Sequence, residues 1–263
     1  VVFPMVSVGA TENALMAAAL AKGPCELVNV AREPEIIDLA NCLNAMGAKI
    51  TGHGTGTILV EGVDELHGAT HAVISDRIEA GTFAIAATMT GGDLTLQRTK
   101  ARTLDALLMV LRETGATVTE TDATIRVVAN GRPVAADITT DPFPGFPTDL
   151  QAQFMAMMCI ANGSSRISET IFENRFMHVP ELLRMGADIK VDGGVAMVRG
   201  RKVLTPAPVM ATDLRASVSL VLAALTIEGK SQISRIYHLD RGYSRLEEKL
   251  GNCGAQLRRI KAS

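Results

Sequence analysis

A single carboxylate on a proline-rich loop is the first feature of the sequence that could do chemistry. Asp149 follows Pro142, Pro144 and Pro147 and precedes the apolar, uncharged run 150–161. Proline fixes φ and disfavours helix in the residue before it, so the sequence predicts a stiff loop that leads into a buried helix. Asp149 is therefore expected in or next to the first turn of that helix.

Two interpretations of Asp149 remain open from its position. The carboxylate could cap the helix, because an acid there accepts a hydrogen bond from a free N–H and faces the positive end of the helix dipole. An ordinary helix cap does not need a rigid loop before it, however. A proline-stiffened loop can also hold a reactive side chain in a fixed position. The second interpretation makes Asp149 a candidate catalytic residue.

An internal repeat predicts the elements that position this loop. The signature Leu-x-x-x-Gly-Ala ends four expected helices at Gly47, Gly115, Gly186 and Gly254, with spacings of 68, 71 and 68 residues. Such regular spacing indicates repeated supersecondary units. A second glycine series keeps nearly the same period and is expected to end the other helix of each unit: Gly23, Gly91, Gly163 and Gly229.

The first unit shows the expected order of elements within each repeat. A helix over 10–22 precedes a strand over 26–30, a second helix over 35–46 and two short strands over 49–51 and 57–61. A further strand over 71–75 is expected to lead into the next unit. Each unit is thus βαβαββ, and the fold class is α/β. The glycine-rich stretch from Gly52 to Gly56 joins two of these strands, so it predicts a hairpin turn and not a phosphate-binding loop.

Composition excludes several classes of function. The 263 residues are 47% hydrophobic, which is ample for two packed domains, and the net charge of −2 gives no electrostatic footprint for nucleic acid. The longest apolar runs, 150–161 and 216–227, are too short to span a bilayer, and no basic leader opens the chain, so we expect no membrane partner and a cytoplasmic protein. The four widely spaced cysteines predict buried thiols and neither disulfides nor a metal site.

Seven motifs occur in a fixed order along the chain: Val6-Ser-Val-Gly-Ala-Thr11, Arg32-Glu-Pro-Glu-Ile36, Asp76-Arg-Ile-Glu-Ala-Gly-Thr82, Phe146-Pro-Thr-Asp149, Glu173-Asn-Arg-Phe176, Ala211-Thr-Asp-Leu-Arg-Ala216 and Asp240-Arg-Gly-Tyr243. Together they resemble the UDP-N-acetylglucosamine 1-carboxyvinyltransferase family, the enolpyruvyl transferases that open peptidoglycan synthesis. The resemblance covers essentially the whole chain.

The resemblance implies a fold of two inside-out α/β barrels, each built from three βαβαββ units, with the substrates between them. Residues 1–74 are then expected to be the last unit of the first domain, and residues 75–263 the second domain. A six-unit protein would begin about 140 residues before Val1. That segment, which carries the family's mobile loop with its proton-donating cysteine, is an expected partner of this chain.

The implied reaction transfers the enolpyruvyl group of phosphoenolpyruvate to the 3-hydroxyl of UDP-N-acetylglucosamine and releases phosphate, without a metal or an organic cofactor. By likeness, Asp149 is the general base for the sugar hydroxyl, with Thr148 beside it, and Asp213 lies near the reacting centre. Three arginines, Arg175, Arg215 and Arg241, are expected to face the phosphate and carboxylate, which guanidinium groups bind bidentately. Ordinary surface ion pairing remains the alternative for each arginine.

The nucleotide is expected to contact two further stretches by the same likeness. One is the main chain of Ile171, and the other is the segment that lines the nucleotide site, namely Met5, Val6, Ser7, Val8 and Gly9. Many members of the family have a lysine where Met5 stands, so a phosphate contact could differ there. Arg215 is also expected in the first turn of a helix, where a cation opposes the dipole and an anion would be favoured.

Three other functions stay open. A fragment could bind the nucleotide sugar without turning it over. The 3-phosphoshikimate 1-carboxyvinyltransferases share the chemistry, although Asp-Arg-Ile-Glu-Ala-Gly-Thr and Glu-Asn-Arg-Phe-Met-His favour the cell-wall enzyme. RNA terminal-phosphate cyclases use related units, but the chain has no basic stripe.

Overall fold

A computed structural model describes residues 1–260 of the chain. The chain divides into two compact units, and each is described by itself. Unit 1 comprises Val1–Ser75 together with the short segment Pro142–Gly145, and unit 2 comprises Asp76–Asp141 and the chain from Phe146 onward. Part of the proline-rich loop thus belongs to unit 1, while Thr148 and Asp149 belong to unit 2.

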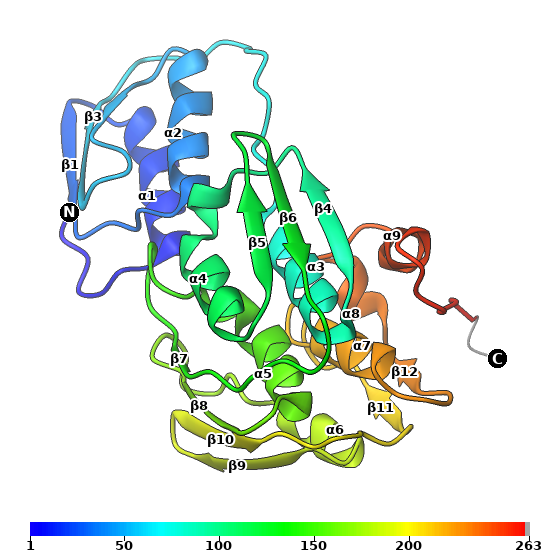
Figure 1. The fold of residues 1–263 in the computed structure, drawn as a ribbon. Coiled ribbons are helices and arrows are strands. Elements are labelled where there is room, and N and C mark those ends of the chain that lie inside the picture. Colours follow the sequence, from blue (N-terminus) through cyan, green and yellow to red (C-terminus); the bar gives the residue numbers. More distant parts are fainter. Residues whose placement is uncertain (261–263) are drawn as a thin grey trace. The chain divides into compact units, whose positions relative to one another are not determined.

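Unit 1 runs helix, strand, helix, strand, strand, and its two helices cover one face of a three-stranded antiparallel sheet of order β1-β3-β2 (Figure 1). The first strand of the expected βαβαββ unit is reduced to a single parallel bridge between Val2 and Val28. Its core consists of apolar side chains from both helices and the inner face of the sheet, including the fully buried Leu15, Ile36 and Ile58. The elements in chain order are α1 (Val8–Ala19), β1 (Pro24–Val28), α2 (Pro34–Ala45), β2 (Lys49–Thr51) and β3 (Thr57–Glu61).

Unit 2 contains three sheets, one for each further repeat. The first has the order β4-β6-β5, the second β7-β8-β10-β9, and the third pairs β11 with β12 in parallel. The strands are β4 (Asp93–Gln97), β5 (Thr117–Glu120), β6 (Thr124–Val128), β7 (Ile138–Thr139), β8 (Ser164–Ser168), β9 (Asp188–Asp192), β10 (Val195–Arg199), β11 (Pro208–Met210) and β12 (Gln232–Ser234).

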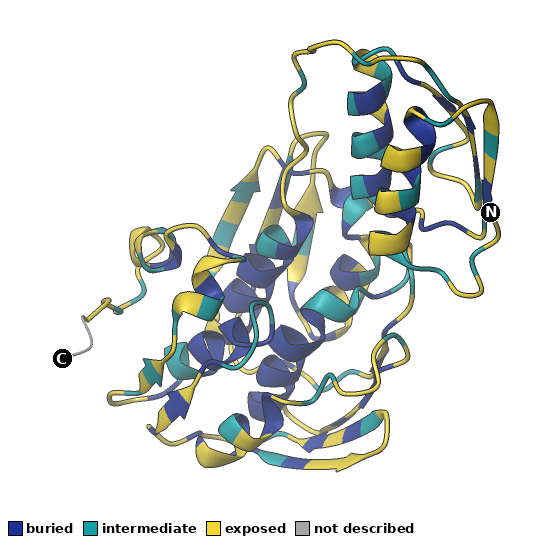
Figure 2. Ribbon diagram, turned by 180° about the vertical axis from the view of Figure 1, so that it is seen from behind, coloured by how far each residue is buried: buried dark blue, intermediate teal, exposed yellow. Residues whose placement is uncertain are grey.

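Three helices form the centre of unit 2, and its sheets lie outside them (Figure 1). All ten residues of α5 are buried, because α5 packs against both α3 and α7. Figure 2 shows these helices in dark blue, whereas strands such as β10 alternate between buried and exposed residues. The helices are α3 (Arg77–Thr90), α4 (Asp105–Glu113), α5 (Gln151–Ile160), α6 (Val179–Arg184), α7 (Val218–Leu225), α8 (Tyr237–Asp240) and α9 (Leu246–Asn252), with 3-10 turns over Ala101–Thr103 and Thr148–Leu150.

The glycine pattern predicted from the repeat is confirmed for the Gly-Ala series, whose glycines directly follow the C-cap residues of α2, α4, α6 and α9. In the second series only Gly91 ends its helix, since α1, α5 and α7 end three or four residues before Gly23, Gly163 and Gly229. All eight glycines of the two series have positive φ, from 67° at Gly91 to 119° at Gly229, a conformation that glycine adopts without the steric cost that other residues incur. The stretch from Gly52 to Gly56 joins β2 to the antiparallel β3, so the predicted hairpin turn is also confirmed.

Several predicted elements differ from the structure. The helix expected over 10–22 begins at Val8, because the Ser7 hydroxyl accepts a hydrogen bond from the N–H of Ala10 and caps the helix. The strand expected over 26–30 ends at Val28, since the next residue, Asn29, has a φ of 61°. The strand expected over 71–75 does not form, because this mostly exposed segment has no strand beside it with which to pair.

The prediction of buried thiols holds for one cysteine. All four cysteines are free, and burial raises the pKa of the Cys159 thiol to about 12. Cys253 is exposed, however, and Cys25 and Cys42 are partly exposed. Apolar neighbours in the sequence therefore did not guarantee that these three side chains would be covered.

Candidate active site

Asp149 lies in the 3-10 turn Thr148–Leu150, directly before α5. Its carboxylate forms an ion pair with the guanidinium of Arg175, 26 residues further along the chain. The helix that follows has no side-chain cap at its N-terminus. The interpretation of Asp149 as a helix cap is therefore wrong, because Arg175 takes the carboxylate that a cap would need.

Arg175 lies on the segment that connects β8 to α6, and its side chain is 19% exposed. The centre of its guanidinium is 4.9 Å from the centroid of the Phe172 ring, which is within the range of a cation–π contact. A shallow cavity of about 460 Å³ opens here and is lined by Ile171, Phe172, Glu173, Asn174, Arg175 and Asp213. The lining thus combines one arginine, one aromatic residue and two acidic residues.

Arg215 lies in a turn that precedes α7 and not in the helix itself, which begins at Val218. The expectation that Arg215 occupies the first turn of the helix is therefore wrong. Asp213 causes the difference, since its Oδ1 accepts hydrogen bonds from the N–H groups of Arg215 and Ala216, both at 2.7 Å. These bonds, with that from the N–H of Asp213 to the Ser217 hydroxyl at 3.0 Å, hold a tight turn before the helix.

The Arg215 guanidinium is held by three groups of unit 2. It donates to the carboxylate of Asp76 at 3.2 Å and to the carbonyl of Gly242 at 3.0 Å, and it lies 5.4 Å from the centroid of the Tyr243 ring. Burial alone would lower the pKa of Arg215, but the charges of Asp76, Tyr243 and Asp149 raise it above its ordinary value. Asp149 thus pairs directly with Arg175 and acts on Arg215 only through its charge.

A buried polar network lies behind Asp149, and the sequence analysis missed it. Gln153 donates from Nε2 to the carbonyl of Asp149 at 2.8 Å and to the hydroxyl groups of Tyr243 and Thr82, both at 3.2 Å. The Tyr243 and Thr82 hydroxyl groups are 2.9 Å apart, and burial raises the pKa of Tyr243 above its ordinary value. The signal was a glutamine inside an otherwise apolar helix, since a buried amide needs partners.

Other predicted site residues lie elsewhere or are already engaged. Met5 to Gly9 belong to unit 1, where Met5 is 64% exposed. Arg241 is exposed, and its side chain makes no hydrogen bond or ion pair with the part of the chain that the structure describes. Thr148 and the N–H of Ile171 both donate to the carboxylate of Glu169, at 2.8 and 2.9 Å.

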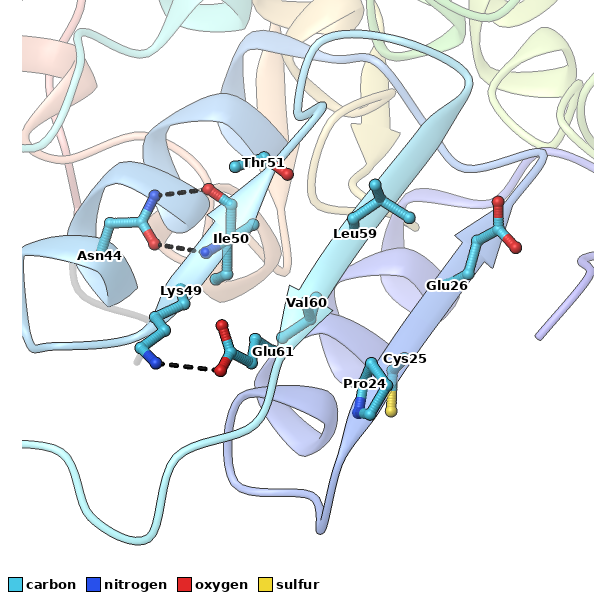
Figure 3. Close-up of a pocket in the computed structure, with 10 residues that line it drawn as sticks. All are labelled: Pro24, Cys25, Glu26, Asn44, Lys49, Ile50, Thr51, Leu59, Val60 and Glu61. Atoms are coloured by element: carbon cyan, nitrogen blue, oxygen red, sulfur yellow. Dashed lines mark hydrogen bonds and ion pairs between the residues drawn. The ribbon is translucent and has the colours of Figure 1, made fainter.

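A larger cavity of about 870 Å³ lies on the outer face of the sheet of unit 1 and contains none of the predicted site residues (Figure 3). The Asn44 amide donates to the carbonyl of Ile50 at 2.9 Å and accepts from its N–H at 2.8 Å, and Lys49 pairs with Glu61 at 3.0 Å. The amide thus covers the free edge of β2, as expected of a protected sheet edge. The smaller cavity beside Arg175 is therefore the better candidate.

None of the helices within residues 1–260 is both long and apolar enough to cross a membrane. In the same described part of the chain, no three histidine, cysteine, aspartate or glutamate side chains are grouped so that they could hold a metal ion.

Comparison with known proteins identifies the family. A model of the family described as EPSP synthase (3-phosphoshikimate 1-carboxyvinyltransferase) matches residues 1–250. The chain belongs to this family. The EPSP synthase family comprises enolpyruvyl transferases, so the resemblance inferred from the seven motifs is confirmed.

Two similar relatives are both named UDP-N-acetylglucosamine 1-carboxyvinyltransferase. The one from Afipia carboxidovorans is 62% identical over 261 residues, which are 98% of this chain and 60% of the relative. The one from Caulobacter vibrioides is 63% identical over 260 residues, which are 98% of this chain and 61% of the relative. The chain therefore spans about three fifths of the length of these members of the EPSP synthase family.

Solved structures confirm the predicted enolpyruvyl transferase fold. The enolpyruvyl transferase NikO from Streptomyces tendae matches with a TM-score of 0.85 and 28% identity, over 95% of this chain and 60% of that protein. The EPSP synthase from Acinetobacter baumannii matches with a TM-score of 0.72 over 97% of this chain and 62% of that protein. At 19% identity, this second likeness concerns the fold of the EPSP synthase family alone.

Proposed function

We propose that the protein carrying this chain transfers the enolpyruvyl group of phosphoenolpyruvate to the 3-hydroxyl of UDP-N-acetylglucosamine and releases phosphate. The observation that carries the proposal is that relatives more than 60% identical over nearly the whole chain are named for this reaction. The family's own description implies 3-phosphoshikimate as acceptor. The solved EPSP synthase structure, however, is only 19% identical to this chain. The reaction would supply a precursor of peptidoglycan, and since both substrates are cytoplasmic metabolites, it would take place in the cytoplasm.

The site supplies a candidate base and cationic groups for such a reaction. Asp149 would remove the proton of the sugar 3-hydroxyl while that oxygen bonds to C2 of phosphoenolpyruvate, and C3 would gain a proton from the loop cysteine expected in the preceding segment. The resulting tetrahedral intermediate would then lose phosphate from C2 and a proton from C3, which restores the double bond. A carboxylate is a weak base for a hydroxyl, so proton removal should be concerted with attack on an activated carbon.

Arg175 and Arg215 would bind the charged groups of the substrates. Phosphoenolpyruvate carries a carboxylate and a phosphate, and each matches the planar fork of a guanidinium. When substrate binds, the Asp149–Arg175 ion pair would have to break, or Arg175 would have to bind the substrate and Asp149 together, because the base must face the sugar hydroxyl. Asp213 borders the cavity and would lie near the reacting carbon, and Arg241, exposed and unpaired within the described residues, would join the anion site.

The nucleotide would occupy the remaining predicted positions. The N–H of Ile171 already donates to Glu169, so its carbonyl is the main-chain group we propose for the nucleotide. Thr148 would lie beside the sugar, and Met5, Val6, Ser7, Val8 and Gly9 of unit 1 would line the nucleotide site. Residues 1–74 would be the last repeat of a first domain and residues 75–263 a second domain, with the preceding segment as partner.

The proposal is tested by the choice of acceptor. The full-length protein is incubated with phosphoenolpyruvate and either UDP-N-acetylglucosamine or 3-phosphoshikimate, and phosphate release and the enolpyruvyl product are measured. Turnover only with the nucleotide sugar is expected. Turnover only with 3-phosphoshikimate, or binding of the nucleotide sugar without phosphate release, would overturn the proposal.

A further inference from the structure

Glu169 has a buried carboxylate that no predicted role uses. It follows directly after β8 and is only 7% exposed. Its Oε1 accepts hydrogen bonds from the Thr140 hydroxyl at 3.0 Å and from the N–H groups of Ile171 at 2.9 Å and Phe172 at 3.1 Å. Its Oε2 accepts from the Thr148 hydroxyl at 2.8 Å. Four donors from three segments therefore compensate for the loss of water around this carboxylate.

The same position in the other repeats has a different conformation. Asn29, Arg98 and Arg235 also follow directly after the corresponding strands, and they have φ values of 61°, 57° and 57°. Glu169 does not have a positive φ. The third repeat thus departs from the others at the residue that reaches the candidate active site, which is expected where function and not the repeat determines the backbone.

The two oxygens of Glu169 bind residues that adjoin the two partners of the Asp149–Arg175 ion pair. Oε2 binds Thr148, the residue next to Asp149. Oε1 binds the turn at Phe172, whose ring contacts the guanidinium of Arg175. A shift of this one side chain would therefore move both the proposed base and its arginine.

We propose that Glu169 is a positioning residue that sets Asp149 and the Ile171–Phe172 turn in register with each other. The proposal rests on the function proposed above, in which this turn contacts the nucleotide sugar and Asp149 takes the proton of the sugar hydroxyl. Small displacements of a reacting group cost large factors in rate, so a rigid support for both groups has a direct effect on catalysis.

Two substitutions separate the geometry from the charge. Glu169→Ala leaves the four donors without their acceptor, so water enters and both segments loosen. Glu169→Gln keeps the shape and one oxygen, which can still accept from Ile171 and Phe172, while its amide group faces Thr148. The Thr148 hydroxyl can then rotate and accept, so the Ile171–Phe172 turn should be kept better than the alignment of Asp149.

The kinetic test uses the full-length protein with phosphoenolpyruvate and UDP-N-acetylglucosamine. Glu169→Ala should lower kcat and raise KM for the nucleotide sugar, each about tenfold or more. Glu169→Gln should lower kcat by a smaller factor and leave KM within about threefold. Glu181→Gln is the matched control, because Glu181 also accepts a main-chain N–H, from Met210 at 3.0 Å, and should change both constants by less than about twofold.

Amide hydrogen exchange gives a readout that does not depend on activity. The N–H groups of Ile171 and Phe172 should exchange about tenfold faster or more in Glu169→Ala, whereas amides of α5 keep their protection. An active wild-type protein whose Glu169 variants match Glu181→Gln in kinetics and exchange would overturn the inference. If the wild-type protein is inactive with both substrates, the proposed function is wrong. In that case, exchange at Ile171 and Phe172 that is the same in Glu169→Ala as in wild type would overturn the positioning role as well. If Glu169→Ala does not fold, the kinetics and amide exchange of Glu169→Gln, compared with those of Glu181→Gln, test the positioning role.

Discussion

The guanidinium of Arg175 forms an ion pair with the carboxylate of Asp149, and this contact decides how the candidate active site can work. The Asp149 side chain is 41% exposed and that of Arg175, which lines the cavity, is 19% exposed, so solvent and a substrate can reach the pair. An anionic substrate can compete for Arg175 and thereby free Asp149. Binding of phosphoenolpyruvate would then prepare the base for the sugar hydroxyl.

The first prediction concerns Asp149→Asn in the full-length protein. Asparagine keeps an oxygen for Arg175 but cannot take the proton, so binding of the nucleotide sugar should change little while turnover falls by about a hundredfold or more. Initial rates and the Kd of the nucleotide sugar check this. Asp93→Asn is the matched control, because Asp93 is ion-paired with Arg126 at 2.6 Å away from the candidate site. Near-normal turnover by Asp149→Asn would exclude it as the base.

The second prediction concerns the proposed anion site. Charge-assisted hydrogen bonds contribute roughly 1.5–3 kcal/mol, so Arg215→Ala and Arg241→Ala should each weaken binding of phosphoenolpyruvate or phosphate about ten- to a hundredfold. Arg112→Ala serves as control, since Arg112 is paired with Glu120 and 43% exposed. Titration of phosphate into each full-length variant measures the effect. Equal, small losses at all three positions would mean that these arginines are ordinary surface groups.

The repeat made much of the fold predictable from sequence. The glycines recur with a nearly constant period because each repeat needs a residue of positive φ at the same places after its helices, and all eight have a positive φ. The three prolines before Asp149 likewise predicted a stiff loop and made Asp149 a candidate catalytic residue. Local patterns of this kind depend on neighbours along the chain, so they can be recognised without tertiary structure.

Contacts between distant segments were not predictable in the same way. The Asp149–Arg175 pair joins residues 26 positions apart, and the Gln153–Tyr243 hydrogen bond joins residues 90 positions apart. The strand expected over 71–75 failed for a related reason, since strand propensity cannot form a ladder without a neighbouring strand. Arg215 lies in a turn because the Asp213 carboxylate accepts from the N–H groups of Arg215 and Ala216. The sequence did not show which N–H groups this carboxylate would bind.

The third prediction tests the buried network behind Asp149. Tyr243→Phe removes the hydroxyl that meets Thr82 at 2.9 Å and Gln153 at 3.2 Å, and it leaves those groups short of a partner. The free energy of unfolding should fall by about 1–2 kcal/mol, as measured by urea denaturation. Tyr237→Phe is the control, because Tyr237 is 54% exposed and should change stability by less than about 0.5 kcal/mol. The ring that faces Arg215 remains, so phosphate affinity should stay within about threefold.

The fourth prediction is a pH dependence of stability that arises from His178. Burial lowers the pKa of this fully buried imidazole to about 4. The negative charge of Asp213 partly raises this pKa, and the positive charge of Arg175 lowers it by a smaller amount. The unfolded chain has a histidine pKa of about 6.5, so between about pH 6.5 and pH 4 the unfolded state binds a proton that the folded state does not. Stability should therefore decrease as the pH falls through this window, by about 3 kcal/mol at most.

Thermal melts of wild type and His178→Leu between pH 4 and pH 7 separate this contribution from those of other groups. Leucine cannot titrate, so the variant should lose Tm less steeply with falling pH than wild type, whatever its stability at pH 7. His67→Gln, which replaces a histidine of unit 1 whose ring contacts the adjacent carbonyl of Gly68 at 3.1 Å, is the control for the loss of a histidine elsewhere in the chain. Parallel curves for all three proteins would show that His178 is not held neutral by burial.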